Sequence, residues 1–412
     1  MLENLQAEKA QYMTIQRIRP LLKECIPLEQ ALGRIVAEDI ISTQDMPPCP
    51  EAAMDGYAVT GSEDGVYQVI GHMRPGGMPV LSLNSGQAVG VVTGGTLPEG
   101  TKAVIQEEAV ELNGDSFKYN KSIEPGANMK PIGENFLKGD LLVSKGARFS
   151  PGRASVLSSL GLSEVTVYKK PLVAILSLGA DVVSCQEEPV PGQMRNSNGV
   201  LVAGLVEREL GKVVAVEAIG AKSSEQMASR IEDMLEHYNI VLTIGGAAYG
   251  AGDQAFELVK ESSAEVLFWG MNIKPGSHSG VAFAGDYFRV RQSMVIALPG
   301  NPLACAVSFN LLVVPVLRAM QDLEPYQPRV TAVCTNAFEK KGGQRRFLLA
   351  HAAYGQNGWE VTILPGQKSS MTTAFLGGWN ALIDLPAGHS PVAEGSEVSV
   401  ILVDTCFLDM LA

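Results

Sequence analysis

The amino-acid sequence predicts a multidomain protein that combines α/β and β structure. Its 412 residues exceed one ordinary domain, since domains average about 150 residues. In the middle third, strand-like and helix-like segments alternate, which is typical of a doubly wound α/β domain. Short strand-like runs rich in Gly and Pro precede this region and others follow residue 328, which indicates a β-rich inserted domain and a C-terminal β-barrel domain.

The central domain is predicted from apolar runs between residues 171 and 325. Leu172–Leu178 is apolar and ends at Gly179, as a buried strand does. Ser223 and Gln226 form a capping-box pattern that predicts the start of a helix. Further strands are expected at 213–219, 239–244, 265–269 and 294–298, and further helices at 196–210, 251–261 and 303–317. This alternation favours a parallel sheet with helices on both faces.

The flanking regions have other patterns. Residues 41–134 contain short alternating runs such as GQAVGVVTGG and KAVIQEEAVEL, which predict the β-rich inserted domain. Residues 13–40 hold two helix-like stretches, TIQRIRPLLKEC and PLEQALGRIVAEDI, and Ser150–Leu160 is a third; together they predict a helical N-terminal domain. The predicted boundaries are 1–40 with 135–170, then 41–134, 171–325 and 326–412.

Charge and composition exclude several classes of protein. The formal charge is −12 and no basic block interrupts it, which argues against nucleic acid as a partner. The polar start MLENLQAEKA lacks the features of a secretory signal, and the apolar run Leu303–Leu317 is too short for a membrane span. The six cysteines lie far apart with no C-x-x-C pair, which argues against a zinc site or disulfide framework and fits a reducing cytoplasm.

A glycine-rich loop after the predicted strand 239–244 is the first candidate site. In an open α/β sheet, ligands collect where strands end, because free N–H groups point outward there. Gly245, Gly246 and Gly250 let the backbone approach an anion closely. Asp253, at the start of the next helix, either holds a cation or caps that helix.

Two more loops follow strands of the same sheet. Leu298-Pro299-Gly300-Asn301-Pro302 is either a rigid helix start, with Asn301 as the N-cap and Pro302 as the first helical residue, or a phosphate pocket that faces this N-terminus. In 177–181, Asp181 is a ligand or a turn residue at even odds. Lys274 offers a cation near the same edge, although a solvated lysine is the default interpretation.

Outside the central domain, Asp55 and Thr93 lie in compact, turn-like segments. Physical reasoning alone assigns Asp55 a turn role more often than a catalytic one. None of the five histidines lies beside a plausible nucleophile, so a hydrolase triad is not supported.

Six ordered motifs resemble those of the molybdopterin molybdenumtransferase family, which includes bacterial MoeA and the E domain of gephyrin. They are AAMDGYAV, VVTGGTLPEG, GEN at 133, the glycine loop at 245–253, NIKPG and LPGNP. The resemblance runs from residue 15 to 405, and six motifs in one order are far more specific than any one of them. It implies an elongated homodimer with a helical N-terminal domain, an inserted β-rich domain, a central molybdopterin-binding α/β domain and a C-terminal β-barrel.

The resemblance also implies an activity in molybdenum cofactor biosynthesis. Molybdenum from molybdate enters adenylylated molybdopterin with Mg²⁺, and AMP is released. In the family the site forms between the central domain of one subunit and the second domain of the other. Expected partners beyond the second subunit are molybdopterin adenylyltransferase and the molybdoenzymes or their chaperones.

Residue by residue, the resemblance assigns roles to positions of this chain. The expected catalytic residues are Asp55, Thr93, Glu134, Asp181 and Asp253. The expected Mg²⁺ ligands are Asp55, Glu134, Asp181 and Asp253. The residues expected to bind the pterin substrate are Gly245, Gly246, Gly250, Lys274, Pro299, Gly300, Asn301, Pro302 and Ser369.

Several polar positions of the family motifs differ in this chain. The family reads D-N-S-A-M-D-G where residues 50–56 read PEAAMDG, and G-E-D where residues 133–135 read GEN. Three further motifs, S-T-G-D-E, G-G-V-S-V-G-E and K-P-G-K-P, are replaced by SLGAD at 177, GGAAYGA at 245 and KPGSH at 274, and Leu349 replaces an arginine. Each lost contact to a charged group is typically worth ~1.5–3 kcal/mol.

Two functions follow from these substitutions. In the first, the chain is an active transferase with an altered pocket. In the second, it is a paralogue that has lost metal insertion and binds or carries molybdopterin or the molybdenum cofactor. We favour the first, because the retained acids are the harder set to keep by chance. A generic pterin-binding fold, as in the related adenylyltransferases, is opposed by the flanking domains, and fold alone would not settle function.

Overall fold

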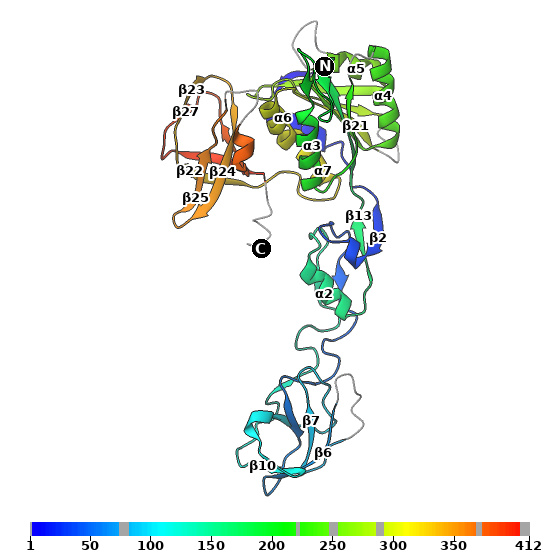
Figure 1. Cartoon of the computed structure of the whole chain (residues 1–412), viewed down its shortest axis with the longest axis vertical. Coiled ribbons are helices and arrows are strands. Elements are labelled where there is room, and N and C mark those ends of the chain that lie inside the picture. The colour runs from blue at the N-terminus through cyan, green and yellow to red at the C-terminus, as the bar shows by residue number, and fades with distance from the viewer. Residues whose placement is uncertain are drawn as a thin grey trace. The chain divides into compact units, whose positions relative to one another are not determined.

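The computed structural model describes residues 2–73, 82–219, 223–246, 254–285, 292–367 and 373–403 (Figure 1). The chain forms two compact units. The first, here the α/β unit, comprises residues 1–24, 33–35 and 167–412, and the second, here the β-rich unit, comprises 25–32 and 36–166. Each unit is described by itself. The finer division into four domains stays a prediction.

A seven-stranded sheet forms the centre of the α/β unit. Its strand order is β1-β19-β20-β21-β18-β14-β17. The bounds are β1 Leu2–Leu5, β14 Leu172–Leu178, β17 Lys212–Ile219, β18 Ile240–Ile244, β19 Ala264–Met271, β20 Gly280–Ala284 and β21 Ser293–Leu298. All five strands predicted for the central domain are present. The neighbours β17, β14, β18 and β21 are parallel, so their carboxyl ends lie at one edge.

The prediction of a parallel sheet is wrong for β20, which runs antiparallel to both β19 and β21. Residues 272–279 are too few for a crossover helix, so the chain turns back and β20 pairs with the strand it has just left. Its sequence, GVAFA, is a short apolar run, and periodicity alone does not decide the conformation of such a run.

Helices cover both faces of the sheet, as predicted. α4 (Ser224–His237) and α5 (Gln254–Glu261) share an apolar core with Leu176 of β14. On the other face, α1 (Ala7–Ile15) and α3 (Ser197–Arg208) share a core with Ile175. Consecutive residues of β14 therefore point to opposite faces and both are buried, as in a strand covered on both sides.

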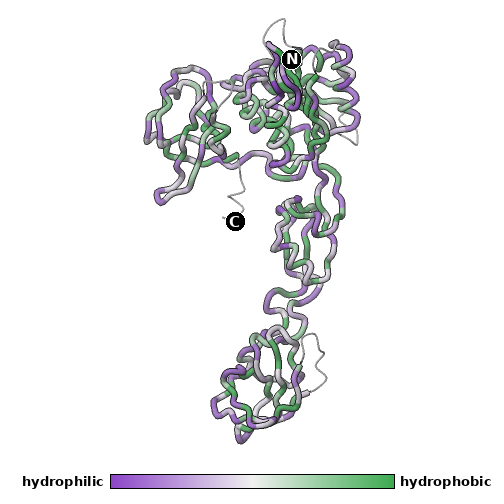
Figure 2. Tube along the Cα trace, in the orientation of Figure 1, coloured by the Kyte–Doolittle hydropathy of each residue, from purple (hydrophilic) through white to green (hydrophobic). Residues whose placement is uncertain are grey.

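One buried helix runs from Pro302 to Ala319 and matches the one predicted at 303–317. It consists of α6 (Pro302–Ser308), the π-helical turn η3 (Phe309–Val313) and α7 (Val314–Ala319). Among the described residues it alone is long and apolar enough to cross a membrane, and 83% of it is buried inside the structure. It is therefore a core helix, and Figure 2 shows hydrophobic residues gathering along the sheet and helices of this unit.

The C-terminal part of the α/β unit is a closed barrel, as predicted, with the order β22-β25-β24-β26-β28. The bounds are β22 Arg329–Cys334, β23 Phe338–Gly342, β24 Arg346–Gly355, β25 Gly358–Ile363, η4 Thr373–Gly377, β26 Ala381–Leu385, β27 Ser390–Val392 and β28 Glu397–Leu402. Leu348 packs inside the barrel, whereas Phe347 and Leu349 join the core of the α/β sheet. The outer face of β24 thus packs on the α/β domain.

The β-rich unit is built on a six-stranded sheet with the order β8-β5-β7-β6-β10-β9. The bounds are β5 Gly56–Val59, β6 Val66–His72, β7 Gln87–Val91, β8 Ala103–Gln106, η2 Glu107–Ala109, β9 Leu112–Asn113 and β10 Ser116–Lys118. Short pairs join β3 (Ile40–Ile41) to β12 (Leu141–Val143) and β4 (Glu51–Ala52) to β11 (Met129–Lys130). The helix predicted at 150–160 is α2 (Pro151–Ser159), which Ser150 caps by accepting a hydrogen bond from the Arg153 N–H.

The prediction of two helices in residues 13–40 is wrong. α1 ends at Ile15, and β2 (Lys23–Pro27) pairs instead with β13 (Glu164–Tyr168), followed by a single 3₁₀ turn, η1 (Leu28–Gln30). Pro20 and Pro27 lack the N–H that a helix interior needs. Pairing with a strand about 140 positions later then overrides the local helix propensity.

The capping box at Ser223 generates a testable prediction. The Ser223 hydroxyl accepts from the Gln226 N–H, and the Gln226 side chain accepts from the Ser223 N–H. Ser223→Ala should destabilise α4 by about 1 kcal/mol, because the first turn loses a partner. Hydrogen exchange of the α4 amides measures this. Ser224→Ala, one residue inside the helix, is the matched control, and equal exchange in the two variants would contradict the assignment.

Candidate functional site

The loops that follow β14, β18 and β21 meet at one edge of the sheet. The three strands are adjacent and parallel, so each ends on the same side. The loops comprise residues 179–181, 245–246 and 299–301, and between the first loop and α3 lie two short paired strands, β15 (Val182–Val183) and β16 (Met194–Arg195). This is the edge at which open α/β sheets bind ligands.

Glycines let these loops come together. Gly245 has φ +82°, and a Cβ there would lie 2.9 Å from the carbonyl oxygen of Leu178. A Cβ on Gly300 would lie 3.3 Å from the Cα of Gly245. The Gly245 N–H donates to the Leu298 carbonyl at 3.0 Å. Backbone rather than side chains therefore fills the centre of this edge, which is what close approach to an anionic ligand requires.

Three polar side chains that sequence reasoning missed complete this edge. The Ser177 hydroxyl donates to Asn196 Oδ1 at 2.8 Å, and that oxygen also accepts from the Gly199 N–H at 2.9 Å, which caps α3. Asn198 Nδ2 donates to the Gly300 carbonyl at 2.7 Å, while its Oδ1 is buried with no hydrogen-bond partner among the described residues. The signal in the sequence was the NSN triplet before a helix, which favours capping.

Asn301 caps the buried helix. Its Oδ1 accepts from the N–H groups of Leu303 and Ala304 at 3.0 and 3.2 Å, and Pro302 occupies the first turn. The structural interpretation of this loop is thus confirmed. Ligand binding by residues 299–302 stays a prediction. Any such contact would use atoms other than Asn301 Oδ1, which is occupied by the cap.

Asp181 and Lys274 are both exposed. A Cβ on Gly179, whose φ is +147°, would lie 2.8 Å from Asp181 Oδ1, so the carboxylate lies directly over that glycine. Lys274 follows β19, which has the same direction as β21, so it belongs to the same edge of the sheet. Its backbone is held by residues Arg345 and Phe347 of the barrel.

In the β-rich unit the structure brings Asp55 and Thr93 together. Asp55 Oδ1 accepts from the Thr93 N–H at 2.7 Å and from the Thr93 hydroxyl at 2.8 Å. These bonds, the backbone one first, hold the pKa of Asp55 below its usual range, because they stabilise the carboxylate. Asp55 Oδ2 makes no hydrogen bond with any described residue. The pair therefore presents an exposed, ionised carboxylate.

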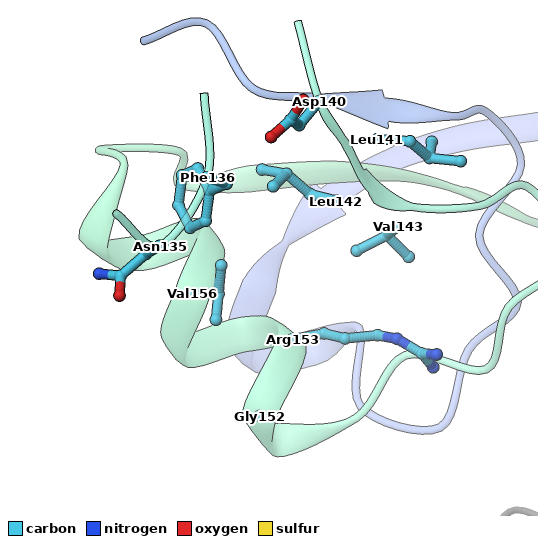
Figure 3. A pocket seen from close by; sticks show the side chains of 9 residues that line it. All are labelled: Asn135, Phe136, Asp140, Leu141, Leu142, Val143, Gly152, Arg153 and Val156. Carbon is cyan, nitrogen blue, oxygen red and sulfur yellow. The ribbon is translucent and has the colours of Figure 1, made fainter. Parts of the chain in front are cut away.

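Glu134 is also exposed, on a loop whose Gly133 and Asn135 N–H groups donate to the carbonyls of Pro47 and Met46. Among the described residues, no hydrogen bond joins its side chain to Asp55 or Thr93. Next to this loop lies a pocket of about 600 Å³ (Figure 3), with these lining residues: Asn135, Phe136, Asp140, Leu141, Leu142, Val143, Gly152, Arg153 and Val156.

The two charged side chains of this pocket make hydrogen bonds within the protein. Asp140 Oδ2 accepts from the Leu137 N–H, and Arg153 donates to the Arg148 carbonyl. The remaining lining is mostly apolar, from residues 136–143 and from α2. We therefore assign the pocket no part in the site.

Three predicted site residues, Gly250, Asp253 and Ser369, lie outside the described residues. Among the residues that are described, no group of three or more His, Cys, Asp or Glu side chains is close enough to hold a metal ion. Leu349, the position at which the resemblance leads us to expect an arginine, is fully buried in the core shared by barrel and sheet.

The hydrogen bonds of Asp55 yield a prediction. Thr93→Val removes the hydroxyl donor but keeps the N–H donor, so the pKa of Asp55 should rise toward its ordinary value without reaching it. An NMR titration of the Asp55 carboxyl measures this. Thr60→Val, which removes a hydroxyl bonded to the Asn84 carbonyl in the same unit, is the control and should leave the pKa of Asp55 unchanged. An unchanged pKa in Thr93→Val would refute the assignment.

A second prediction concerns Gly245. Gly245→Ala should destabilise the α/β unit by about 1–3 kcal/mol, because its φ is positive and the new Cβ meets the Leu178 carbonyl. Gly204→Ala, within α3 and with open space around the new Cβ, should instead stabilise it by about 0.5–1 kcal/mol. Urea unfolding gives the free energy of unfolding of each variant, and hydrogen exchange of the β18 amides compares their local stability. Similar effects of both substitutions would contradict the close approach of the loops.

Comparison with known proteins identifies this arrangement. Three family models match in order: the MoeA N-terminal region (domain I and II) at residues 5–161, a probable molybdopterin binding domain at 174–319 and the MoeA C-terminal region (domain IV) at 331–403. Molybdopterin molybdenumtransferases of Staphylococcus epidermidis and Staphylococcus aureus are 30% identical over 391 residues, which cover 92% of this chain and 91% of each of those proteins.

Solved structures agree. Two crystal structures of molybdopterin biosynthesis MoeA proteins from Pyrococcus horikoshii superpose with TM-scores of 0.81 and 0.77 at 29% and 26% identity. The superpositions cover 97% of this chain and 99% and 100% of those chains. The likeness thus extends over both units and the barrel. The chain belongs to the molybdopterin molybdenumtransferase (MoeA) family.

Proposed function

We propose that this protein inserts molybdenum from molybdate into adenylylated molybdopterin and releases AMP. The observation that carries the proposal is the sheet edge at which Gly245, Gly300 and Asn198 meet, in a chain related over its whole length to molybdopterin molybdenumtransferases. The substrates are a pyrophosphate ester and an oxyanion. A protein with a formal charge of −12 must bind them through local donors rather than through its net charge.

The sheet edge is proposed as the pterin and pyrophosphate site. Backbone N–H groups at Gly245, Gly246 and Gly250, together with Pro299 to Pro302, would line it, and the start of α3 adds the positive end of a helix dipole. Asn198 is added to this set. Its buried, unpartnered Oδ1 supports the addition, because a buried acceptor without a donor is costly and a ligand donor would satisfy it.

The carboxylates are proposed as Mg²⁺ ligands. Mg²⁺ in phosphate-transfer sites is usually held by one or two carboxylates plus waters and substrate oxygens, not by a cage of protein groups. The exposed carboxylates of Asp181 and Asp55 fit this pattern, as do Glu134 and Asp253 by position in the sequence. Bound Mg²⁺ would neutralise the anionic oxygens of the substrates.

Individual residues of the chain would then act on the anions. Thr93 orients Asp55 so that one carboxylate oxygen is committed and the other remains free for a ligand. Because the pKa of Asp55 is lowered, the carboxylate stays ionised and able to ligate at a lower pH than an ordinary aspartate does. Lys274 and Ser369 are proposed to contact substrate oxygens.

Assembly and location belong to the same proposal. We expect a homodimer, a cytoplasmic location, and hand-over of substrate and product to molybdopterin adenylyltransferase and molybdoenzymes or their chaperones. Sedimentation of the purified protein tests the dimer. The carrier alternative is not favoured, since the relatives that match over nine tenths of the chain are named as transferases.

The decisive test follows AMP release from adenylylated molybdopterin with molybdate and Mg²⁺. Wild-type protein should release AMP only when molybdate is present. Asp55→Asn should lower the rate roughly 100-fold or more, since fixed charge at a reacting anion is typically worth that much.

Asp64→Asn is the matched control. Asp64 lies in the same unit, is exposed, and accepts bonds from Ser62 Oγ and the Val66 N–H much as Asp55 does from Thr93. Its substitution should leave the rate unchanged. Tight pterin binding by the wild type without molybdate-dependent AMP release would sink the proposal and restore the carrier alternative.

A further inference from the structure

The backbone of Lys274 is clamped by the start of a barrel strand. The Lys274 N–H donates to the Arg345 carbonyl at 2.9 Å, and the Phe347 N–H donates to the Lys274 carbonyl at 3.0 Å. A parallel β-bridge joins Lys274 to Arg346. The exposed lysine therefore takes its place from the barrel segment 345–347, about 70 positions away in the sequence.

The other side of the same loop rests on the buried helix. A Cβ on Gly276 would lie 2.7 Å from Ser308 Oγ, so the loop has no room to move toward α6. The Ser279 hydroxyl lies within hydrogen-bonding distance of both Ser308 Oγ, at 2.8 Å, and the Gly276 carbonyl, at 3.0 Å. Because one side of this loop is fixed on α6, the position of Lys274 depends on the barrel segment on its other side.

Arg345 is in turn fixed by a buried carboxylate. Its Nε and one terminal nitrogen donate to the two oxygens of Asp384 at 2.7 and 2.6 Å, the fork geometry that suits Arg best. Asp384 is 3% exposed. Burial by itself raises the pKa of Asp384, but the bonds from Arg345 and Arg329 outweigh it and keep that pKa below its usual value. The guanidinium also lies over the Phe347 ring at 5.2 Å.

Arg329 offers an internal comparison. It donates to the same Asp384 carboxylate at 2.6 Å, from β22, and among the described residues no hydrogen bond joins it to Lys274. Two arginines thus share one buried carboxylate, and of these two Arg345 is the one whose own backbone bonds to Lys274 among the described residues. The β24–β26 ladder, in which Phe347 lies opposite Asp384, holds the same segment through its backbone, so the arginine side chain adds to this pairing. Glu8, which pairs with the outer nitrogen of Arg345, is mostly exposed and adds little.

We infer that Arg345, anchored by Asp384, is a positioning residue for Lys274: the barrel sets where the lysine ammonium stands at the sheet edge. One part of the inference, the role of Lys274 as a contact to an anionic substrate, rests on the proposed function. The clamp itself stands on the hydrogen bonds alone. We assign both residues a role through Lys274 and no role as catalytic residues, because their side chains are paired with each other and Asp384 is buried.

Arg345→Met tests the inference, with Arg329→Met as the matched control. In each variant Asp384 keeps one arginine, so no buried carboxylate is left unpaired. Hydrogen exchange reads the clamp without reference to activity. The Lys274 and Phe347 amides should exchange roughly tenfold faster in Arg345→Met, because the local opening becomes easier, and remain near the wild-type rate in Arg329→Met. Unchanged exchange at both amides in Arg345→Met overturns the clamp.

A double-substitution cycle on KM measures the effect of Arg345 on the reaction. Lys274→Met should raise the KM of one anionic substrate about tenfold or more, and Arg345→Met should raise the same KM about three- to tenfold. Once Lys274 is already Met, Arg345→Met should add less than about twofold, since it acts through the lysine. Arg329→Met should leave KM within about twofold of the wild-type value.

The outcomes separate the two ideas. If Arg345→Met raises KM equally with and without Lys274, or if Arg329→Met raises it as much, the residue only stabilises the barrel and the inference fails. If the wild type releases no AMP while the amides exchange as expected, the proposed function fails and the clamp on Lys274 stands.

Discussion

Burial of the helix from Pro302 to Ala319 is the constraint on which the α/β unit depends. One apolar core contains Ile175 of the sheet, Phe309 of this helix and Phe347 of the barrel, all fully buried. Each large apolar side chain of this kind contributes about 1.5–3 kcal/mol. Because the sheet, helix and barrel share one close-packed core, their relative positions are fixed, and so are the loop ends that they carry. The start of the helix, the Lys274 loop and the barrel segment 345–347 therefore form one rigid rim.

Hydrogen bonds position the polar groups at this rim, whereas apolar packing holds the core beneath them. Ser177, Asn196 and Asn198 each make hydrogen bonds that define where α3 begins and where the Gly300 carbonyl points. In the β-rich unit, Thr93 orients Asp55 through two hydrogen bonds and lowers its pKa. Leu349 belongs to the buried core and not to these polar groups.

Prediction from sequence succeeded where the determinants are local and failed where they are distant. The Ser223 capping box, the Asn301 cap and the strand Leu172–Leu178 depend on neighbours a few residues away, and all three are present. Residues 23–27 carry a helix-like pattern yet form a strand, because pairing with Glu164–Tyr168 outweighs propensity. The motifs singled out Asp55 and Thr93, which the structure brings together, and Lys274; their roles stay predictions. The NSN triplet signals a helix cap, but nothing in it indicates that Asn198 reaches Gly300, and the partners of Lys274 carry no signal in its own segment.

By itself the sequence determined the order of the elements, the buried helix, the barrel and the family, since periodicity, caps and ordered motifs are properties of contiguous residues. Only the tertiary structure decided which polar atoms meet. Asn198 reaches Gly300 across 102 positions and Arg345 reaches Asp384 across 39. A hydrogen bond depends on tenths of an ångström, and no local propensity specifies such distances between remote segments. The packing of one shared core sets them.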